Sequence, residues 1–356
     1  MRTARRFLAT SFVLAALAGG CGGELGDDFL PDARIDAVRE DGEAPDDRAD
    51  LPDIGPDADG DADGDADADA GADADADADG DIGADADADG AADADADASR
   101  TVCELWRAEY PTRATRVWTA GADACDPGTL DPVALEDGLR RTNLYRRLVG
   151  LPPIGNNAEF TRKAQLCAVL QRAMGTLNHT PPASAPCYTA DGAEAAGSSN
   201  LALGVGDLAQ AVDLFLADDG VASLGHRRWL LHPPYTQGGF GFADGYACQW
   251  VFGWGVDPRI DPVALPPEGE FPLQALPAVW SLGSSAGGFT GATVTVTRVS
   301  DGAAVVLDEV WVPPAGYGLE TIAWRVRAAP AAGEYRIQVT GRARSWDYTT
   351  NLVDCR

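Results

Sequence analysis

Histidine and lysine are scarce in this sequence of 356 residues, which holds three histidines and, in Lys163, a single lysine. Several motifs that are typical of catalytic or nucleotide-binding sites are missing as well. There is no G-x-S-x-G turn for a serine nucleophile, no P-loop lysine and no dinucleotide fingerprint. No cysteines stand as C-x-x-C, and no cysteine–histidine cluster has zinc-finger spacing. Acyl-enzyme chemistry, nucleotide binding and a structural zinc module are therefore not expected.

Basic charge is also in short supply, since the formal net charge is −29. Most of the excess lies in residues 24–100, which hold 30 acidic residues and four basic ones. The remainder of the chain has a mild acidic excess. Because a polyanion repels nucleic acid, the composition argues against nucleic-acid binding.

Residues 22–100 lack side chains that could build a core, because aspartate and alanine alternate through most of the segment. Ordering such a segment costs entropy with no apolar surface to bury, so we expect a disordered tether. Weak calcium binding is the alternative. The stretch "DGDADG" (Asp59 to Gly64) resembles the first half of a calcium loop, but Ala70 stands where an EF-hand supplies its bidentate glutamate.

Long hydrophobic runs are absent except at the N-terminus, where three arginines precede "FLATSFVLAALAGG". The run is too short to span a membrane comfortably and is typical of an export signal. It ends at Cys21 in a context that resembles a bacterial lipobox. We therefore interpret residues 1–21 as a lipoprotein signal peptide, with lipidated Cys21 as an anchor at the outer membrane or cell surface of a bacterium. An ordinary signal peptide cut near Gly20 is the alternative.

An even number of cysteines follows Cys21, as expected for an exported chain with three disulfides. The six candidates are Cys103, Cys125, Cys167, Cys187, Cys248 and Cys355. Sequence alone leaves many connectivities open; the pairs we predict are 103–125, 167–187 and 248–355.

Three helices are predicted within residues 101–260. The first begins at Asp131, an N-cap followed by proline, and ends near Gly150. The second places apolar residues at helical spacing and ends near Gly175. The third opens with a capping box formed by Asp207 and Gln210.

The hydrophobic period then changes to two. A hairpin is predicted at "ADG", followed by an alternating run of Tyr246, Cys248, Trp250, Phe252 and Trp254, whose aromatic face we expect in the core. Helices flanking an antiparallel sheet predict an α-β-α sandwich for residues 101–260, within an α+β fold.

Residues 261–356 begin with a proline-rich joint and continue with short alternating strands at regular turn spacing. This pattern predicts a small all-β sandwich of the immunoglobulin or fibronectin kind. The segment has no histidine and no convergent acidic cluster, so we interpret it as a packing or adhesion module.

Five stretches in order carry a resemblance to a known family: "RRTNLYRRLVGLPPI", "KAQLCAVLQRAM" with "LNH", "SNLALG", "GHRRWLLHP" and "GFGFADGYACQWVFG". Residues 130–256 are similar to the CAP superfamily of cysteine-rich secretory, antigen 5 and pathogenesis-related 1 proteins, also called SCP-like. With the predicted lipid anchor, the chain resembles a bacterial lipoprotein branch of that family.

The resemblance implies two histidines and two acidic residues around one open cleft. His179 matches the first histidine and His226 the second. The second acid maps to Asp218, with Asp219 as an alternative. A metal set of His179, His226 and Asp218 would leave one position open, as Zn²⁺ does in several hydrolases.

The first acid of the family pattern is missing. Ser199 stands in its place, directly before Asn200, unless Glu194 reaches in from another register. We therefore count Ser199, Asn200, Asp219 and Glu194 as binding-cleft candidates. The histidines could instead share acid–base work, line a polar cleft floor, or bond stray backbone groups at helix ends.

Three further residues near His226 have predicted roles. Arg227 and Arg228 are expected to face solvent or pair with the acids upstream. His232, which precedes two prolines, is expected to be structural.

The resemblance implies binding at the cell surface, with a lipid, an envelope component or a protein as ligand. Zinc binding in the cleft is compatible with this interpretation but is not required by it. The alternative is a metal-dependent hydrolase acting on a peptide, envelope or nucleic-acid substrate. A purely structural surface protein is the third interpretation. Of the three, binding is favoured over catalysis.

Overall fold

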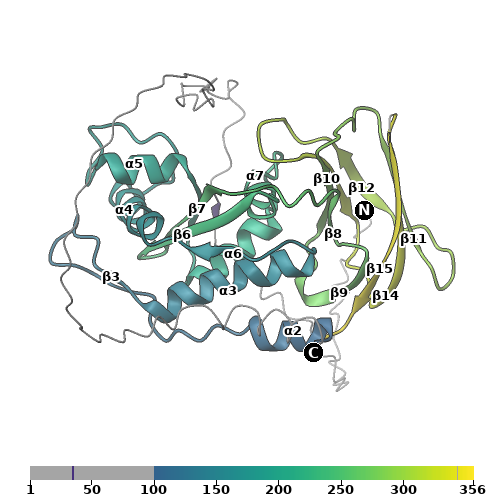
Figure 1. Ribbon diagram of the computed structural model, residues 1–356, viewed down its shortest axis with the longest axis horizontal. Helices are drawn as coiled ribbons and strands as arrows, with labels where there is room; N and C mark the ends of the chain where they lie inside the picture. Colours follow the sequence, from purple (N-terminus) through teal and green to yellow (C-terminus); the bar gives the residue numbers. More distant parts are fainter. Residues whose placement is uncertain (1–33, 36–99, 343) are drawn as a thin grey trace, which may run out of the picture.

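The computed structural model describes residues 34–35, 100–342 and 344–356 (Figure 1). The predicted signal peptide, lipidated Cys21 and nearly all of the acidic tether, with its calcium alternative, lie outside these residues and stay predictions. Within the described ranges no helix is long and apolar enough to cross a membrane.

The first part of the described chain combines helices with one mixed sheet. Its helices are α2 (Val102–Glu109), α3 (Pro132–Leu148), α4 (Ala158–Met174), α5 (Ala190–Gly197), α6 (Leu208–Ala217) and α7 (Gly225–Leu230). Its strands are β1 (Arg34–Ile35), β2 (Trp118–Thr119), β3 (Thr129–Leu130), β4 (Gly155–Asn156), β5 (Ser199–Leu203), β6 (Tyr235–Ala243) and β7 (Tyr246–Trp254).

The central sheet has the order β1-β5-β7-β6-β4, and β2 pairs with β3 separately. Helices α4 and α5 cover one face of the sheet, and α3, α6 and α7 lie on the other (Figure 1). The predicted α-β-α arrangement is confirmed.

The three predicted helices are confirmed because their capping residues act as the sequence indicates. Asp131 accepts a hydrogen bond from the backbone N–H of Val133, and Asp207 accepts one from Gln210. Helix α4 ends at Gly175, which adopts the left-handed conformation (φ 70°). Such a residue terminates the helix and favours glycine.

Three short helices, α2, α5 and α7, were not predicted from the sequence. Helix α5 consists mostly of alanine and glycine, so it has no bulky residues at helical spacing. Helix α7 spans six residues, too few to show a period. Helix α2 is eight residues long and begins with a capping box formed by Thr101 and Glu104.

Helix α4 packs directly onto the sheet at two glycines of β6. A Cβ atom at Gly239 would overlap the backbone of Phe160, and one at Gly241 would overlap that of Ala164. The absence of side chains at these positions therefore sets the close approach of helix and sheet.

The predicted aromatic face of β7 is interrupted by a bulge. Register shifts from the pair of Gln237 with Gly253 to the pair of Gly239 with Trp250, so two residues of β7 oppose one of β6. Before the bulge, Trp250 stacks on Phe160 of α4, with ring centroids 4.6 Å apart.

Beyond the bulge, Phe252 and Trp254 turn to the opposite face and contact Trp229 of α7. Their side chains are 39 % and 55 % exposed, respectively. The expectation that these two rings belong to the core is wrong, because a bulge inverts the alternation on which it was based.

The C-terminal part is a β-sandwich. Its elements are β8 (Val263–Leu265), β9 (Gly269–Pro272), a 3-10 turn η1 (Leu273–Ala275), β10 (Val279–Ser284), β11 (Thr293–Arg298), β12 (Leu307–Trp311), β13 (Glu320–Val326), β14 (Gly333–Thr340) and β15 (Ser345–Val353). The two sheets have the orders β12-β13-β10-β8 and β11-β14-β15-β9. The predicted all-β sandwich is confirmed, and the proline-rich joint supplies its strands β8 and β9.

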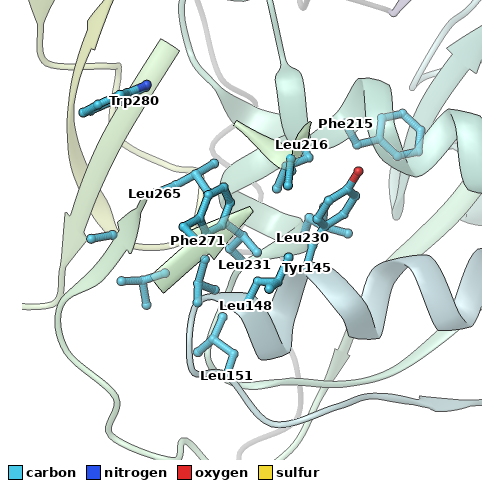
Figure 2. Packing of buried hydrophobic residues seen from close by; sticks show 14 of the residues in the cluster. Tyr145, Leu148, Leu151, Phe215, Leu216, Leu230, Leu231, Leu265, Phe271 and Trp280 are labelled. Carbon is cyan, nitrogen blue, oxygen red and sulfur yellow. The ribbon is translucent and has the colours of Figure 1, made fainter. Parts of the chain in front are cut away.

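The two parts share one hydrophobic core. Leu148 and Leu151, at and just beyond the end of α3, lie close to Leu231, Leu265 and Phe271 (Figure 2). The same cluster continues to Trp280 in β10. Apolar surface of the mixed part is thus removed from water by the sandwich.

Three disulfides form among the six cysteines, as predicted, but all three predicted pairings are wrong. The observed pairs are Cys103–Cys355, Cys125–Cys187 and Cys167–Cys248. The pairings follow from tertiary packing, which brings the paired cysteines together. Helix α4 lies against β7, which brings Cys167 to Cys248, and α2 lies beside the C-terminus, where the Nε of Arg107 donates to the carbonyl of Cys355 at 2.9 Å.

Candidate functional site

His226 and Asp218 form the polar centre of the predicted site. Asp218 ends α6 in the left-handed conformation, and His226 lies in the first turn of α7. The two side chains meet with 2.8 Å between Nδ1 of His226 and Oδ1 of Asp218. The other carboxylate oxygen accepts a hydrogen bond from the backbone N–H of Arg227 at 3.0 Å. One carboxylate therefore fixes both the imidazole and the turn between the two helices.

Asn200 joins this pair from strand β5. Its side-chain amide donates to the backbone carbonyl of His226 over 3.0 Å. Phe215 of α6 stacks on the imidazole, with centroids 5.5 Å apart. All three polar residues are buried, with His226 at 5 % exposure. The structure thus brings together three predicted site residues, which we call the His226 group: His226, Asp218 and Asn200.

His179 lies in a more open setting. It follows α4, is half-buried, and its Nδ1 lies 2.8 Å from the carbonyl oxygen of Ala196 in α5. A histidine near a helix end that contacts a backbone carbonyl also fits the structural alternative.

Ser199 occupies the position of the missing acid but points away from Asn200, because successive residues of a strand face opposite sides. Its buried Oγ makes no hydrogen bond within the described part of the chain. Ser199 is thus not presented to the imidazole of His226 as a nucleophile.

The two remaining acidic candidates are engaged by cations. Glu194 of α5 lies 2.8 Å from Nζ of Lys163, and Asp219 lies 2.7 Å from a guanidinium nitrogen of Arg325 in β13. Both carboxylates are largely exposed. Asp219 therefore ties α6 to the β-sandwich.

The residues do not fit the zinc set that the sequence predicted. Among residues 34–35, 100–342 and 344–356, no group of three or more histidine, cysteine, aspartate or glutamate side chains is arranged to hold a metal ion. Asp218 already accepts hydrogen bonds at both oxygens. Neither His179 nor Glu194 completes a metal site with His226 and Asp218.

The His226 group nevertheless has a defined chemistry. In the neutral imidazole, acceptance by Asp218 selects the tautomer with the proton on Nδ1 of His226 and the lone pair on Nε2. A carboxylate that orients an imidazole in this way is a common supporting arrangement for bases and metal ligands. In this structure its clearest effect is to order the α6–α7 turn.

The prediction that Arg227 and Arg228 face solvent or pair with acids is wrong. Arg227 is almost fully buried, and its guanidinium donates to the carbonyls of Leu216, Ala217 and Val279 at 2.6–2.9 Å. A fourth contact, at 3.3 Å, reaches the hydroxyl of Ser281. The side chain therefore joins α6 to β10 of the sandwich.

Arg228 makes a second bridge of the same kind. Its guanidinium donates to the carbonyls of Ser223, Pro314 and Leu319 at 2.7–3.1 Å. Burial lowers the pKa of both Arg227 and Arg228 to about 10. Even so, both cations stay protonated near neutral pH, and backbone carbonyl dipoles rather than carboxylates receive most of their hydrogen bonds.

Between these arginines and strands β8, β10 and β13 lies a hollow of about 20 Å³. It is lined by Arg227, Arg228, Leu231, Val263, Leu265, Ser281, Gly283, Leu319 and Thr321. That volume holds about one water molecule and is too small for an organic ligand.

His232, predicted to be structural, packs among aromatic rings. Its ring meets Trp229 and Trp254 edge-on at 5.7 and 5.5 Å. Its Nδ1 is buried and has no hydrogen-bond partner in the described ranges. Burial lowers the pKa of His232 to about 4. These features support the structural interpretation.

Comparison with known proteins locates a family in the first part of the chain. Residues 139–253 match the model of the CAP, or cysteine-rich secretory protein, family. No curated protein matches the chain significantly.

Similar solved structures cover parts of the chain. An extracellular protein with an SCP domain from Bacillus anthracis is 20% identical, covering 34% of this chain and 43% of that protein, with a TM-score of 0.28. PcoC, a methionine-rich copper resistance protein from Escherichia coli, is 17% identical over 25% of this chain and 93% of that one, with a TM-score of 0.21. One chain from the ZIG-8–RIG-5 IG1-IG1 heterodimer is 14% identical over 27% and 89%, with a TM-score of 0.16.

The order of helices and strands, the α-β-α layering and the family match agree. This chain contains a CAP domain, matched over residues 139–253 and followed by a C-terminal β-sandwich.

Proposed function

We propose that this is an exported bacterial lipoprotein that binds a ligand at the cell surface through its CAP domain. Three disulfides in a CAP-domain protein are consistent with secretion, because such bonds persist in oxidising compartments. Lipidated Cys21 would anchor the chain at the outer membrane or cell surface. The acidic segment would hold the folded part away from the membrane; weak calcium binding is the alternative role for this segment.

The His226 group is the observation that carries this proposal. It draws one residue from β5, one from the end of α6 and one from α7 into a buried hydrogen-bonded unit. Burying such groups is costly unless they are satisfied, and once satisfied they hold one conformation. We infer that the group fixes the α6–α7 side of a recognition surface, and that the half-buried His179, which contacts α5, is a second recognition residue.

The ligand classes that follow from this setting are a lipid, an envelope component or a protein. Ser199 lies on the other face of β5 from Asn200, and the described residues contain no three-ligand metal set. Ligand recognition therefore accounts for the arrangement without the further metal ligands or nucleophile that hydrolysis would require.

A metal-dependent hydrolase is the second candidate, and one observation favours it. The contact of Asp218 with Nδ1 leaves Nε2 of His226 oriented as a ligand or base. Activity would need further ligands from a rearranged His179 segment or from the substrate.

Sedimentation with isolated envelope fractions tests the proposal. We would use the full chain carrying Cys21→Ala, so that no acyl chain contributes, and compare it with His179→Ala in the same background. Asp308→Ala, an exposed change on the β-sandwich, is the control. We expect binding that survives chelator, weakens in His179→Ala and is unchanged in the control. Hydrolysis of an envelope or peptide substrate that chelator abolishes would instead establish the second candidate.

A further inference from the structure

One segment of the CAP domain, residues 229–256, is almost free of charge. Between Trp229 and Val256 the sequence contains a single acidic residue, Asp244, and no lysine or arginine. Asp244 lies in the turn between β6 and β7. The opposite ends of these strands therefore present a surface with no ionised side chain of their own.

Three apolar side chains emerge from this end, and we call them the aromatic tip: Phe252, Trp254 and Val256. Their exposure rises along the chain from 39 % to 55 % to 90 %. The glycines between them leave the other side of the strand free to pack closely. A Cβ atom at Gly255, for example, would lie 2.7 Å from the hydroxyl of Thr236.

The tip rests on a layer of half-buried rings. Trp229 of α7 contacts Phe252 at 4.8 Å and Trp254 at 5.9 Å between centroids, and Tyr317 from the β12–β13 loop lies 6.3 Å from Trp229. His232 adds an edge contact to Trp254. Packing from beneath restricts the rotamers of Phe252 and Trp254, so these two side chains have little conformational entropy left to lose on binding.

The size of the tip argues against a stable protein partner. A whole aromatic side chain offers about 150–250 Å², so the exposed parts of the three residues amount to roughly 350 Å². One side of a stable protein–protein interface buries about 800 Å². A partner would need much more of the surrounding surface than the apolar tip provides.

The composition of the tip suits a lipid interface. Indole rings favour the headgroup level of a bilayer, while phenylalanine and valine favour the acyl boundary. The next charged residues, Asp257 and Arg259, have opposite signs. Attraction to anionic lipid is therefore not the source of binding.

We propose that the aromatic tip inserts into the interfacial region of an uncharged lipid bilayer. This contact is separate from the predicted acyl anchor and from the His226 group, so it stands or falls independently of the proposed function.

Flotation with vesicles of pure phosphatidylcholine tests the proposal on the full chain carrying Cys21→Ala. Val256→Asp is the main variant, because a side chain exposed to this degree can change without unfolding the domain. Val306→Asp is its matched control, an exposed valine before β12. Unchanged thermal unfolding of both variants would verify their folds.

We expect the parent chain to float with the vesicles at both low and high salt. Val256→Asp should weaken this binding about tenfold or more, and Val306→Asp should leave it unchanged. Three results would overturn the proposal: no flotation of the parent chain, flotation that needs anionic lipid, or flotation unaffected by Val256→Asp. A change of oligomeric state in Val256→Asp with unchanged flotation would assign the tip to a protein contact.

Discussion

At the scale of single residues, buried arginines account for much of the order around the His226 group. Arg227 and Arg228 satisfy carbonyls from both parts of the molecule. Arg146 of α3 does the same within the CAP domain, donating to Pro152, Leu230, His232 and Tyr235 at 2.9–3.0 Å. Each guanidinium has several donors in a fixed plane, which suits a cluster of converging carbonyls.

Replacing Arg227 by methionine should destabilise the protein strongly. The change keeps apolar bulk but leaves the carbonyls of Leu216, Ala217 and Val279 buried without donors. We expect a loss of about 3 kcal/mol or more in the free energy of unfolding, measured with urea. Arg325→Met removes an exposed ion pair and should cost about 0–1 kcal/mol. Equal losses in the two variants would contradict the bridging role of Arg227.

His232 should make stability depend on pH. Burial lowers the folded-state pKa of His232 from 6.5 to about 4. At a pH between these two values the imidazole is protonated in the unfolded chain and neutral in the folded chain. Asp257 acts in the opposite direction and Arg146 in the same one. The contribution of His232 is thus complete above about pH 6.5 and is lost as pH falls toward 4.

Unfolding of wild type and His232→Phe at pH 7.5 and 4.5 measures this effect. The variant keeps the aromatic contacts and removes the titration. We expect wild type to lose about 1–2 kcal/mol more than the variant on acidification, since part of the ring faces solvent. An equal loss in both proteins would show that His232 does not contribute.

The sequence indicated some of these residues and not others. The resemblance pointed to His226, Asp218 and Asn200 because their spacing follows a family pattern. It could not reveal that Arg227 and Arg228 are buried, since their acceptors at Val279 and Leu319 lie far along the chain. A charged residue is predicted to be exposed when its hydrogen-bond partners, which lie far along the chain, are not known.

At the scale of elements, local signals predicted the long helices and failed where packing decides. Capping residues located α3, α4 and α6. Helix α5 lacked an apolar period, and the regular alternation of residues in β7 did not reveal the bulge opposite β6. The same limit explains the disulfide pairings, because the partners of α4 and α2 are tertiary contacts.

The Cys103–Cys355 disulfide should contribute more stability than the exposed Cys125–Cys187 disulfide. It joins α2 to the C-terminus across a sequence separation of 252, against 62 for the other. A longer loop loses more entropy in the cross-linked unfolded chain. We expect the double serine variant at 103 and 355 to lose about 1 kcal/mol more than the one at 125 and 187, by urea unfolding. The reverse order would show that strain or residual structure outweighs loop entropy.

At the scale of the whole molecule, the CAP domain and β-sandwich form one packed unit. The shared hydrophobic cluster crosses between them (Figure 2). The arginine bridges and the Cys103–Cys355 disulfide do so as well. The sequence predicted two regions of different class, with the change near residue 261. It gave no sign of their common core, because a sequence pattern does not show which faces meet.

Calorimetry tests whether the CAP domain and the β-sandwich unfold as one cooperative unit. We expect one unfolding transition, with equal calorimetric and van't Hoff enthalpies, because neither part can bury its contact face alone. Arg227→Met should shift the whole transition to lower temperature. Two separate transitions, with only one moved by the substitution, would mean that the parts are thermodynamically independent.

Metal analysis after dialysis against zinc bears most directly on the proposed role of the His226 group. We would compare the full chain with its His179→Ala and His226→Ala variants by elemental analysis. A ligand-recognition group that fixes the α6–α7 turn predicts no stoichiometric zinc in any of the three proteins. Stoichiometric zinc in the wild type, lost in both variants, would contradict this account and identify a metal centre.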